Sequence, residues 1–464
     1  MLDRKFMFIV GGALIFIAVV VVIMIAMGSS EKKPPKVTGP TILTIWGYDE
    51  DRTIYDQIFN EFQTDNKNVK VQYDKKNIET YASDAIDSIA SGKGPDIWIV
   101  PNNWIPKFHD KMIAVKETAF EDKSLKKDGL EVYKDTFPPV VFKDMTINNK
   151  IYGIPMTIDT LKLYYNPVIF SHVLADYEEK HLEEDIQPVR DLLTSYPQNW
   201  EEILKLIKLI TVKNGDSIDR SAIALGTNNN IRFSDDIVKL LMMQNGAEAV
   251  SPDFKSARFQ TQYNAFGGVG FPGAQALKFY ASFADPKSEN YTWNTSMPDV
   301  VRAFAEGKTA MMISYDDVLK DITLINPQAN FVAVPFPQIK QTASPVNLAS
   351  YNAFTVTKAS KNPDLAWDLV LKLAVNYDSL GNYYSNLAVK KNMANIKMFG
   401  IPSDPIGNQI MTSKNWFEPD PQKTPTIFKD MINQANEGKD IQTAVEGAAA
   451  QCTSLLQKLD LSNQ

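Results

Sequence analysis

Short apolar strands alternate with amphipathic helices, and this alternation limits the possible fold more than any other feature of the sequence. Residues 42–46 (ILTIW) predict a strand, and the helix predicted after it has its apolar positions at Ile54, Tyr55, Ile58, Phe59 and Phe62. The pattern repeats with a strand at 69–73, a helix around 81–89 and an apolar strand at 97–100. A β-α-β-α-β order requires a parallel or mixed sheet with helices on its faces. The sequence therefore predicts an α/β fold.

Helix-start signals continue through the rest of the chain. Asn199 and Glu202 have the spacing of a capping box, and Ser296 and Asp299 show the same spacing before a second predicted helix. Gly307 can end that helix in a left-handed turn before a strand at 310–314. Helices and strands are thus expected along most of the chain.

An uncharged apolar segment occupies residues 6–27 (FMFIVGGALIFIAVVVVIMIAM). Its length of about 22 residues is sufficient to cross a hydrocarbon core of about 30 Å. We therefore expect one transmembrane helix as an anchor, followed by a linker at 28–40 that is rich in Gly, Ser, Pro and Lys. A cleaved signal peptide is the alternative, although apolar regions of signal peptides are usually shorter.

Composition excludes several classes of function. The formal net charge of −7 gives no basic surface for nucleic acid. One Cys and three His cannot provide an internal disulfide or a zinc site made of thiolates, and we expect no metal and no other cofactor. The sequence lacks the common hydrolase and metalloprotease motifs, so we expect a protein that is not an enzyme. Cys452 falls at helical spacing with Ala444, Val445 and Ala448, which predicts a buried side chain.

Seven fragments in a fixed order resemble one protein family. They are LTIWGYDE (43–50), ASGKGPDIWIV (90–100), IYGIPMTIDTLKLYYNP (151–167), PQNWEEILKLIKLIT (197–211), VVRAFAEGKTAMMIS (300–314), FVAVPFPQ (331–338) and NAFTVTKASKNPDLAWDLVLKLA (352–374). In this order they resemble the family 1 extracellular solute-binding proteins of ABC importers, which include maltodextrin and other sugar binders.

This resemblance implies a fold of the periplasmic-binding-protein type, with two hinge-linked lobes of mixed sheets flanked by helices. Lobe I would contain residues 41–148 and 346–398, and lobe II residues 149–342 and 400–464. The lobes would follow the transmembrane helix at 6–27 and the linker at 28–40.

The same resemblance implies a function. The chain would be a membrane-tethered, extracellular, monomeric protein that captures a carbohydrate or similar polar solute in a cleft between the lobes. It would deliver this solute to the permease subunits of an ABC importer. Its place would be the cytoplasmic membrane, with a single pass and the soluble domain on the extracytoplasmic side. An extracellular glycan hydrolase and a binding protein for sensing or adhesion without transport are the alternatives.

Candidate ligand-binding residues follow from topology, because ligands of open α/β sheets bind beyond the carboxyl ends of the strands. Two tryptophans in polar loops, Trp293 and Trp416, are weaker candidates. Tryptophan is usually well buried, so packing in the core is the alternative for Trp46 and Trp104. The residues expected at strand ends are Trp46, Tyr48, Asp49, Asn102, Asn103, Trp104, Asp159, Tyr315, Asp316, Tyr351 and Asn352.

Overall fold

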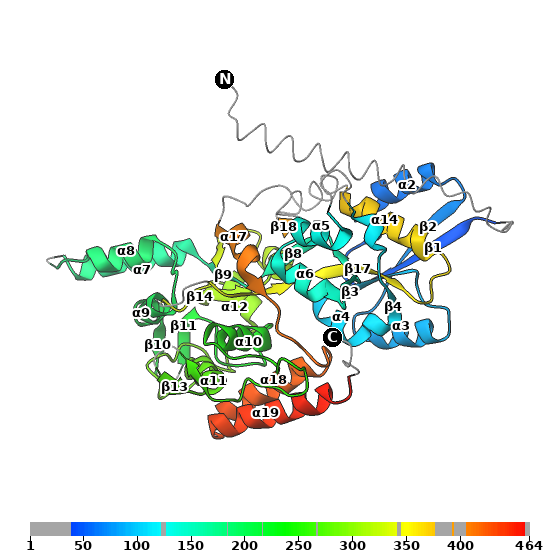
Figure 1. Cartoon of the computed structure of the whole chain (residues 1–464). Helices are drawn as coiled ribbons and strands as arrows, with labels where there is room; N and C mark the ends of the chain where they lie inside the picture. The colour runs from blue at the N-terminus through cyan, green and yellow to red at the C-terminus, as the bar shows by residue number, and fades with distance from the viewer. Residues whose placement is uncertain are drawn as a thin grey trace. The chain divides into compact units, whose positions relative to one another are not determined.

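The computed structural model describes residues 39–121, 127–182, 184–215, 217–265, 268–340, 345–375, 392–393 and 405–459. These residues divide into two compact units (Figure 1). Unit 1 contains the described residues within 1–159 and 350–403, and unit 2 those within 160–349 and 404–462. The predicted transmembrane helix at 6–27, and all of the predicted linker except residues 39 and 40, lie outside the described residues. Among the helices that are described, none is long and apolar enough to span a membrane.

Unit 1 is built on a six-stranded sheet with the order β2-β1-β3-β17-β4, in which β7 also pairs with β17. β1 runs parallel to β2 and β3, whereas β17 runs antiparallel to β3, β4 and β7. The strands are β1 (Thr41–Gly47), β2 (Val69–Lys75), β3 (Ile97–Pro101), β4 (Met112–Ile113), β7 (Ile154–Pro155) and β17 (Asn352–Thr357). The mixed sheet predicted from the alternating pattern is therefore present.

Helices cover both faces of this sheet, with α2 and α14 on one side and α3 on the other (Figure 1). α2 (Asp56–Asp65) buries Ile58, Phe59 and Phe62, which are the apolar positions that predicted it. The other helices of unit 1 are α3 (Tyr81–Ala90), α4 (Ile105–Phe108), α5 (Gly129–Thr136), α6 (Pro139–Met145) and α14 (Pro363–Val375). Its remaining short strands are β5 (Thr146–Ile147), β6 (Lys150–Ile151), β8 (Thr157–Thr160) and β18 (Asn392–Met393).

The first segment of unit 1 ends later in the chain than the boundary predicted for lobe I. It continues to Asp159, whereas the expected boundary followed residue 148. Strand pairing gives the reason, because Ile154 and Pro155 of β7 pair with Phe354 and Ala353 of β17. The second segment begins at Ser350 and not at 346. The strand β16 (Asn347–Ser350) leads into this segment, and its residues Asn347 and Leu348 pair with β19 (Ser413–Lys414), which belongs to unit 2.

Unit 2 is built on a five-stranded sheet with the order β10-β11-β14-β9-β15. β11 runs parallel to β14, and β9 runs antiparallel to both β14 and β15. The strands are β9 (Lys162–Tyr165), β10 (Val212–Asn214), β11 (Ser217–Ile223), β14 (Thr309–Ser314) and β15 (Val332–Pro335). A separate hairpin is formed by β12 (Tyr263–Ala265) and β13 (Gly268–Gly270).

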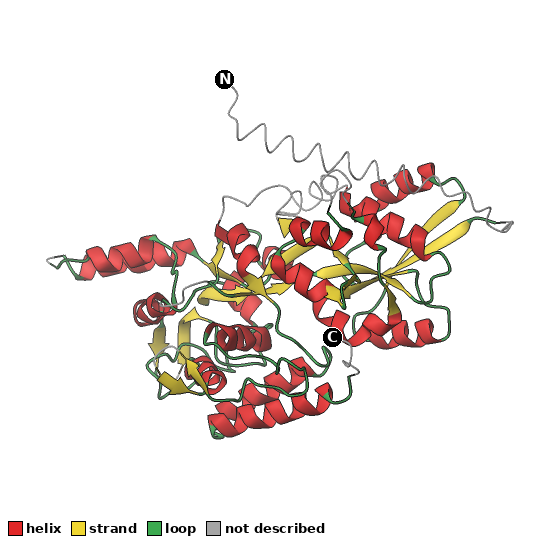
Figure 2. Cartoon of the chain, viewed as in Figure 1, coloured by secondary structure: helices red, strands yellow, loops and turns green. Residues whose placement is uncertain are grey.

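The helices of unit 2 enclose a large apolar core, and α7 and α8 form a hairpin that projects from the rest of the unit (Figure 2). The side chain of Cys452 is buried in α19, as its spacing predicted. The helices are α7 (Pro167–Lys180), α8 (Gln187–Thr194), α9 (Trp200–Ile210), α10 (Ser234–Gln244), α11 (Pro272–Ser282), α12 (Val300–Ala305), α13 (Leu319–Ile325), α17 (Pro405–Thr412), α18 (Thr424–Asn436) and α19 (Ile441–Leu456).

The helix starts test the capping signals in the sequence. Asn199 caps α9 and accepts a hydrogen bond from the backbone N–H of Glu202, as predicted. The prediction for the start of α12 was wrong by three residues, because the N-cap is Asp299 and not Ser296. The side chain of Asp299 accepts a hydrogen bond from the backbone N–H of Val301. Asp299 therefore has the capping role that was predicted for Ser296. Gly307 follows α12 with a φ of 72°, the left-handed conformation expected there.

Asp96 connects three segments of the unit 1 sheet, and this generates a prediction for stability. Its carboxylate accepts hydrogen bonds from the backbone N–H and hydroxyl of Thr44 and from the hydroxyl of Ser360. We expect Asp96→Ala to lower the free energy of unfolding by about 2–3 kcal/mol, because partly buried donors lose a charged acceptor. Asp87→Ala, at an exposed position of α3, is the matched control. Equal midpoints of urea unfolding for the two variants would contradict this role.

Candidate functional site

The carboxyl ends of β1 and β3 lie at the same edge of the unit 1 sheet, because the two strands are parallel. β17 begins at this edge, since it is antiparallel to β3 and Asn352 pairs with Pro101. Three segments that are far apart in the sequence therefore meet here: 48–50, 102–104 and 351–352. We call them the unit 1 edge. The topological argument predicted ligand-binding residues in all three segments.

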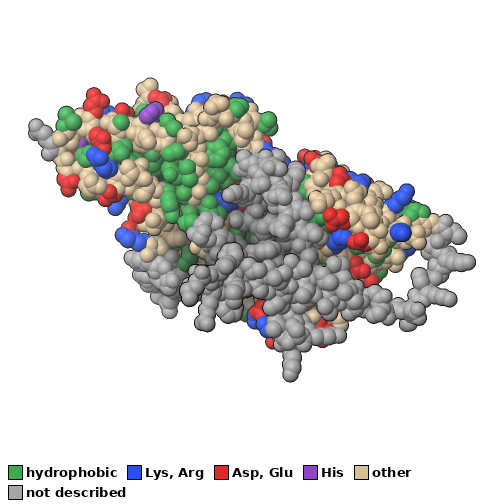
Figure 3. Space-filling model, turned by 90° about the horizontal axis from the view of Figure 1, so that it is seen from above, with side chains coloured by type: hydrophobic (Ala, Val, Ile, Leu, Met, Phe, Trp, Pro, Cys, Tyr) green, Lys and Arg blue, Asp and Glu red, His purple; other side chains and the backbone are tan. Residues whose placement is uncertain are grey.

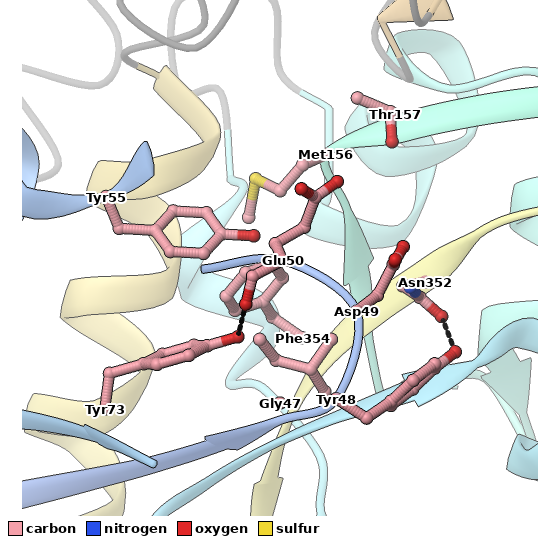
Figure 4. Close-up of a pocket in the computed structure, with 11 residues that line it drawn as sticks. Gly47, Tyr48, Asp49, Glu50, Tyr55, Tyr73, Met156, Thr157, Asn352 and Phe354 are labelled. Atoms are coloured by element: carbon pink, nitrogen blue, oxygen red, sulfur yellow. Dashed lines mark hydrogen bonds between the residues drawn. The ribbon is translucent and has the colours of Figure 1, made fainter. Parts of the chain in front are cut away.

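A small hollow opens at the unit 1 edge (Figure 4). Its volume is about 20 Å³, which is enough for about one water molecule. Figure 4 shows the Asp49 carboxylate directed toward Asn352, and the Glu50 carboxylate directed toward Met156 and Tyr55. The lining residues combine aromatic faces with carboxylate, hydroxyl and amide groups: Gly47, Tyr48, Asp49, Glu50, Tyr55, Tyr73, Ile99, Met156, Thr157, Asn352 and Phe354.

Tyr48 is fixed in place by hydrogen bonding and by ring packing. Its hydroxyl donates to Oδ1 of Asn352 at 2.5 Å, which joins the segment after β1 to the start of β17. Its ring lies 5.0 Å from the ring of Tyr81, measured between centroids. Burial, with a further contribution from the charge of Asp49, raises the pKa of Tyr48 far above its ordinary value. The hydroxyl therefore remains a hydrogen-bond donor at every physiological pH.

Tyr73 reaches the same hollow from β2. Its hydroxyl donates to the backbone carbonyl of Glu50 at 2.7 Å, and burial followed by the charge of Glu50 raises its pKa. Gly47 makes room for this ring, since a Cβ at position 47 would lie 2.2 Å from the Tyr73 hydroxyl oxygen. Tyr55 packs with its ring centroid 5.8 Å from that of Tyr73. Together these residues hold the 47–50 turn against the sheet.

Three of the predicted residues contribute to the framework behind this edge. Asn102 and Tyr351 both donate side-chain hydrogen bonds to Oδ2 of the buried Asp144, at 3.0 and 2.8 Å. Burial and the neighbouring Asp144 charge raise the pKa of Tyr351, so its hydroxyl stays protonated. Trp104 is 6% exposed and packs against the rings of its neighbours Tyr81, Trp98 and Phe108. The structure thus places Trp104 in the core, which was the alternative to ligand contact stated for this tryptophan.

Three other predicted residues of unit 1 are half-buried and do not line the hollow. The Nζ atom of Lys76 lies 4.1 Å from the ring centroid of Trp46, a cation–π geometry. Asn103 lies in the turn after β3, and Asp159 lies in β8 at the end of the first segment of unit 1. The structure brings Tyr48, Asp49 and Asn352 together and leaves these three outside the hollow.

The predicted residues of unit 2 that follow β14 are both buried. Tyr315 follows β14, and its hydroxyl donates to Oδ2 of Asp236 at 3.1 Å. Asp316 is 6% exposed, forms an ion pair with Lys162 at 2.7 Å and accepts from the Tyr164 hydroxyl at 2.5 Å.

The two weaker candidates are also buried. Trp293 is fully buried and donates its indole N–H to Asn230 at 3.0 Å. Trp416 is 3% exposed and packs against the rings of Phe259 and Phe428.

A second hollow, of about 320 Å³, lies at the base of the α7–α8 hairpin. Its lining is largely apolar and includes Tyr165, Phe170, Leu174 and Leu193. Hydrophobic side chains gather on the surface of unit 2 in the view of Figure 3. The sequence reasoning singled out no residue of this hollow.

Sequence reasoning also missed several residues of the unit 1 hollow. The sequence pattern indicates Tyr55 and Tyr73 as apolar positions of a helix and a strand, and it gives no information about where their hydroxyl groups lie. Register offers a signal for Tyr73, because it pairs with Ile45 close to the end of β1. The others are Gly47, Glu50, Ile99, Met156, Thr157 and Phe354.

Chemically, the unit 1 hollow combines aromatic faces with hydrogen-bonding groups. The rings of Tyr48, Tyr55 and Tyr73 can pack against C–H surfaces, and the carboxylates of Asp49 and Glu50 can accept hydrogen bonds from hydroxyl groups. Such a mixture is typical of sites that orient a polar small molecule.

Solved structures with the same fold include several binding proteins. The ABC transporter solute-binding protein of Thermotoga lettingae, bound with α-D-tagatose, superposes with a TM-score of 0.63 at 18% identity, covering 90% of this chain and 100% of that chain. For the sugar-binding protein MalE of Xanthomonas citri the TM-score is 0.68 at 16% identity, with 90% and 98% coverage. The GacH receptor of Streptomyces glaucescens, solved unliganded and with acarbose, gives 0.66 at 15% identity, with 91% and 100% coverage. These likenesses confirm the predicted two-lobed fold.

Sequence comparison gives the family. A relative from Brucella abortus (strain 2308) that is named as a binding protein is 20% identical over 419 residues, which are 87% of this chain and 90% of the relative. Residues 47–374, well over half of the chain, match the family described as bacterial extracellular solute-binding protein. The chain therefore belongs to the family of bacterial extracellular solute-binding proteins.

Proposed function

We propose that this protein is a membrane-tethered solute-binding protein that captures a carbohydrate or a similar polar solute for an ABC importer. Family membership supports extracytoplasmic solute binding. Structures with the same fold were solved in complex with tagatose, acarbose or maltotriose, which supports a sugar as the class of solute. Permease subunits of the importer are the proposed protein partner.

The observation that carries the proposal is the composition of the unit 1 hollow. A sugar ring has an apolar C–H face and a rim of hydroxyl groups, so it needs an aromatic surface beside hydrogen-bonding side chains. Tyr48, Asp49 and Asn352 meet this need at a strand-end edge. A volume of about 20 Å³ is too small to enclose a sugar ring, so we expect the ligand to rest across the mouth of the hollow.

The other candidate residues have different proposed roles. Trp46, Asn103 and Asp159 are half-buried and are kept as candidates for ligand contact. Asn102, Trp104 and Tyr351 support the edge from behind, through Asp144 and the aromatic core. Tyr315 and Asp316 follow the end of a strand in unit 2, where the same topological argument applies to them.

Thermal unfolding in the presence of a panel of sugars tests the function. A ligand that binds the folded state at 100 times its Kd stabilises the protein by about 2.7 kcal/mol. We expect at least one mono- or oligosaccharide to raise the unfolding midpoint by several degrees, with an affinity confirmed by calorimetry. Amino acids and short peptides form the comparison set. A shift caused only by the comparison set would contradict a sugar ligand.

Asp49 provides the sharpest test of the site. With the sugar found in that panel, we expect Asp49→Asn to weaken binding about tenfold, because a charged acceptor for hydroxyl groups is lost. Asp51→Asn is the matched control, since Asp51 is exposed, pairs with Lys75 and does not line the hollow. Calorimetry that gives the same Kd for both variants would show that Asp49 does not contact the ligand.

The apolar segment at 6–27 supports the proposed tether by its length. We expect the full chain to fractionate with membranes and a chain lacking residues 1–28 to be released as soluble protein. Mass spectrometry of the purified full chain should recover its N-terminal region. A mature protein that starts near Ser29 would replace the anchor with a cleaved signal peptide.

A further inference from the structure

Unit 2 contains a buried charge cluster around Lys239, in the helix α10. The ammonium group contacts Oδ2 of Asp235 at 2.9 Å, Oδ1 of Asp236 at 3.0 Å and Oε1 of Glu418 at 2.5 Å. Only 1% of the Lys239 side chain is exposed, with 9% for Asp235, 25% for Asp236 and 4% for Glu418. We call these four residues the Lys239 cluster.

Three carboxylates surround one ammonium group in this cluster. Burial of excess charge is costly, and a carboxyl group in such surroundings reduces the cost by taking up a proton. Burial alone would lower the pKa of Lys239, but the charges of Asp235, Asp236 and Glu418 raise it well above its ordinary value. The ammonium therefore stays charged, and a proton that enters the cluster must reside on a carboxylate.

The carboxyl groups of Glu418 and Asp236 are the acceptors for such a proton. Burial, opposed by the charge of Lys239, raises the pKa of Glu418 to about 7. Burial raises the pKa of Asp236 too, and Lys239 again opposes the shift. Groups this close titrate as one coupled system, so the proton belongs to the pair and not to one residue.

Neighbouring elements place further polar and titratable groups near the cluster. α10 packs against α11 and α18, and α11 and α18 both pack against α19. On α18 the ring of Phe428 lies 5.4 Å from Nζ of Lys239. The titratable groups that interact with the cluster from other elements include Tyr315 after β14, Tyr280 on α11 and Cys452 on α19. All three are neutral in their protonated form, and burial raises the pKa of Tyr280 and Cys452.

We propose that the Lys239 cluster binds one proton near neutral pH and that this proton stabilises unit 2. The direction of the effect follows from linkage. The pKa of Glu418 is about 7 in the folded protein and close to its ordinary value of 4.5 when the chain is unfolded. The stabilisation is fully present below about pH 4.5 and is lost as the pH rises through about 7. An extracellular protein meets such changes of pH directly.

Infrared spectroscopy of the full chain in mild detergent tests proton binding directly. We expect a C=O stretching band of a protonated carboxylic acid at pH 6 that disappears at pH 9, and that decreases in Glu418→Gln or Asp236→Asn. Glu437→Gln, at an exposed position after α18, is the matched control and should keep the band. A band of the same size in the wild type and in both cluster variants would overturn the proposal.

Unfolding at different pH values tests the effect on stability. Glutamine keeps an oxygen acceptor for Lys239 but has no titratable group. Between pH 5 and pH 8 the unfolding constant of the wild type should therefore rise about tenfold or more relative to that of Glu418→Gln. The ratio of the Glu437→Gln constant to that of the wild type should stay the same. If Glu418→Gln does not fold, the same comparison is made with Asp236→Asn. If the ratio of the wild-type unfolding constant to that of the cluster variant did not depend on pH, this result would also overturn the proposal.

Discussion

Unit 1 depends on the antiparallel pairing of β17 with β3. The partners are about 250 residues apart in the sequence, and five residue pairs from Asn352–Pro101 to Val356–Ile97 fix their register. A shift by one residue would turn every side chain of β17 to the opposite face of the sheet. The register therefore determines that Asn352 meets Tyr48, that Tyr351 meets Asp144 and that Phe354 packs against Tyr55. The hollow and the framework behind it both result from this pairing.

Local patterns in the sequence predicted much of the fold. The alternation of strands and helices over residues 42–100 was correct for two reasons. The helices α2 and α3 each bury one face, which imposes a helical period on their apolar residues, and β3 is buried on both faces, which leaves a continuous apolar run. The unit boundary was less accessible to such reasoning. β7 has only two residues, Ile154 and Pro155, and it belongs to unit 1 through a partner strand about 200 residues away. A two-residue strand has no period from which to predict it.

The candidate site was predictable only in part, for reasons that lie in the side chains. Tyr48, Asp49 and Asn352 were found because they directly follow or begin strands whose ends share an edge. Tyr55 and Tyr73 were missed because a tyrosine has a ring that fits the core and a hydroxyl that does not. The same ambiguity affected tryptophan, because Trp104, Trp293 and Trp416 all use their rings inside the cores. Sequence does not distinguish a ring that faces ligand from one that faces the interior.

The division of unit 1 into two segments has a consequence for the time course of synthesis. About 190 residues of unit 2 separate its first segment from β17. At a synthesis rate of roughly 5–20 residues per second, the first segment waits roughly 10 to 40 seconds before β17 is made. During that interval the edge of β3 has no partner and is open to pairing with other chains. Unit 1 therefore cannot complete its sheet until most of unit 2 has been made.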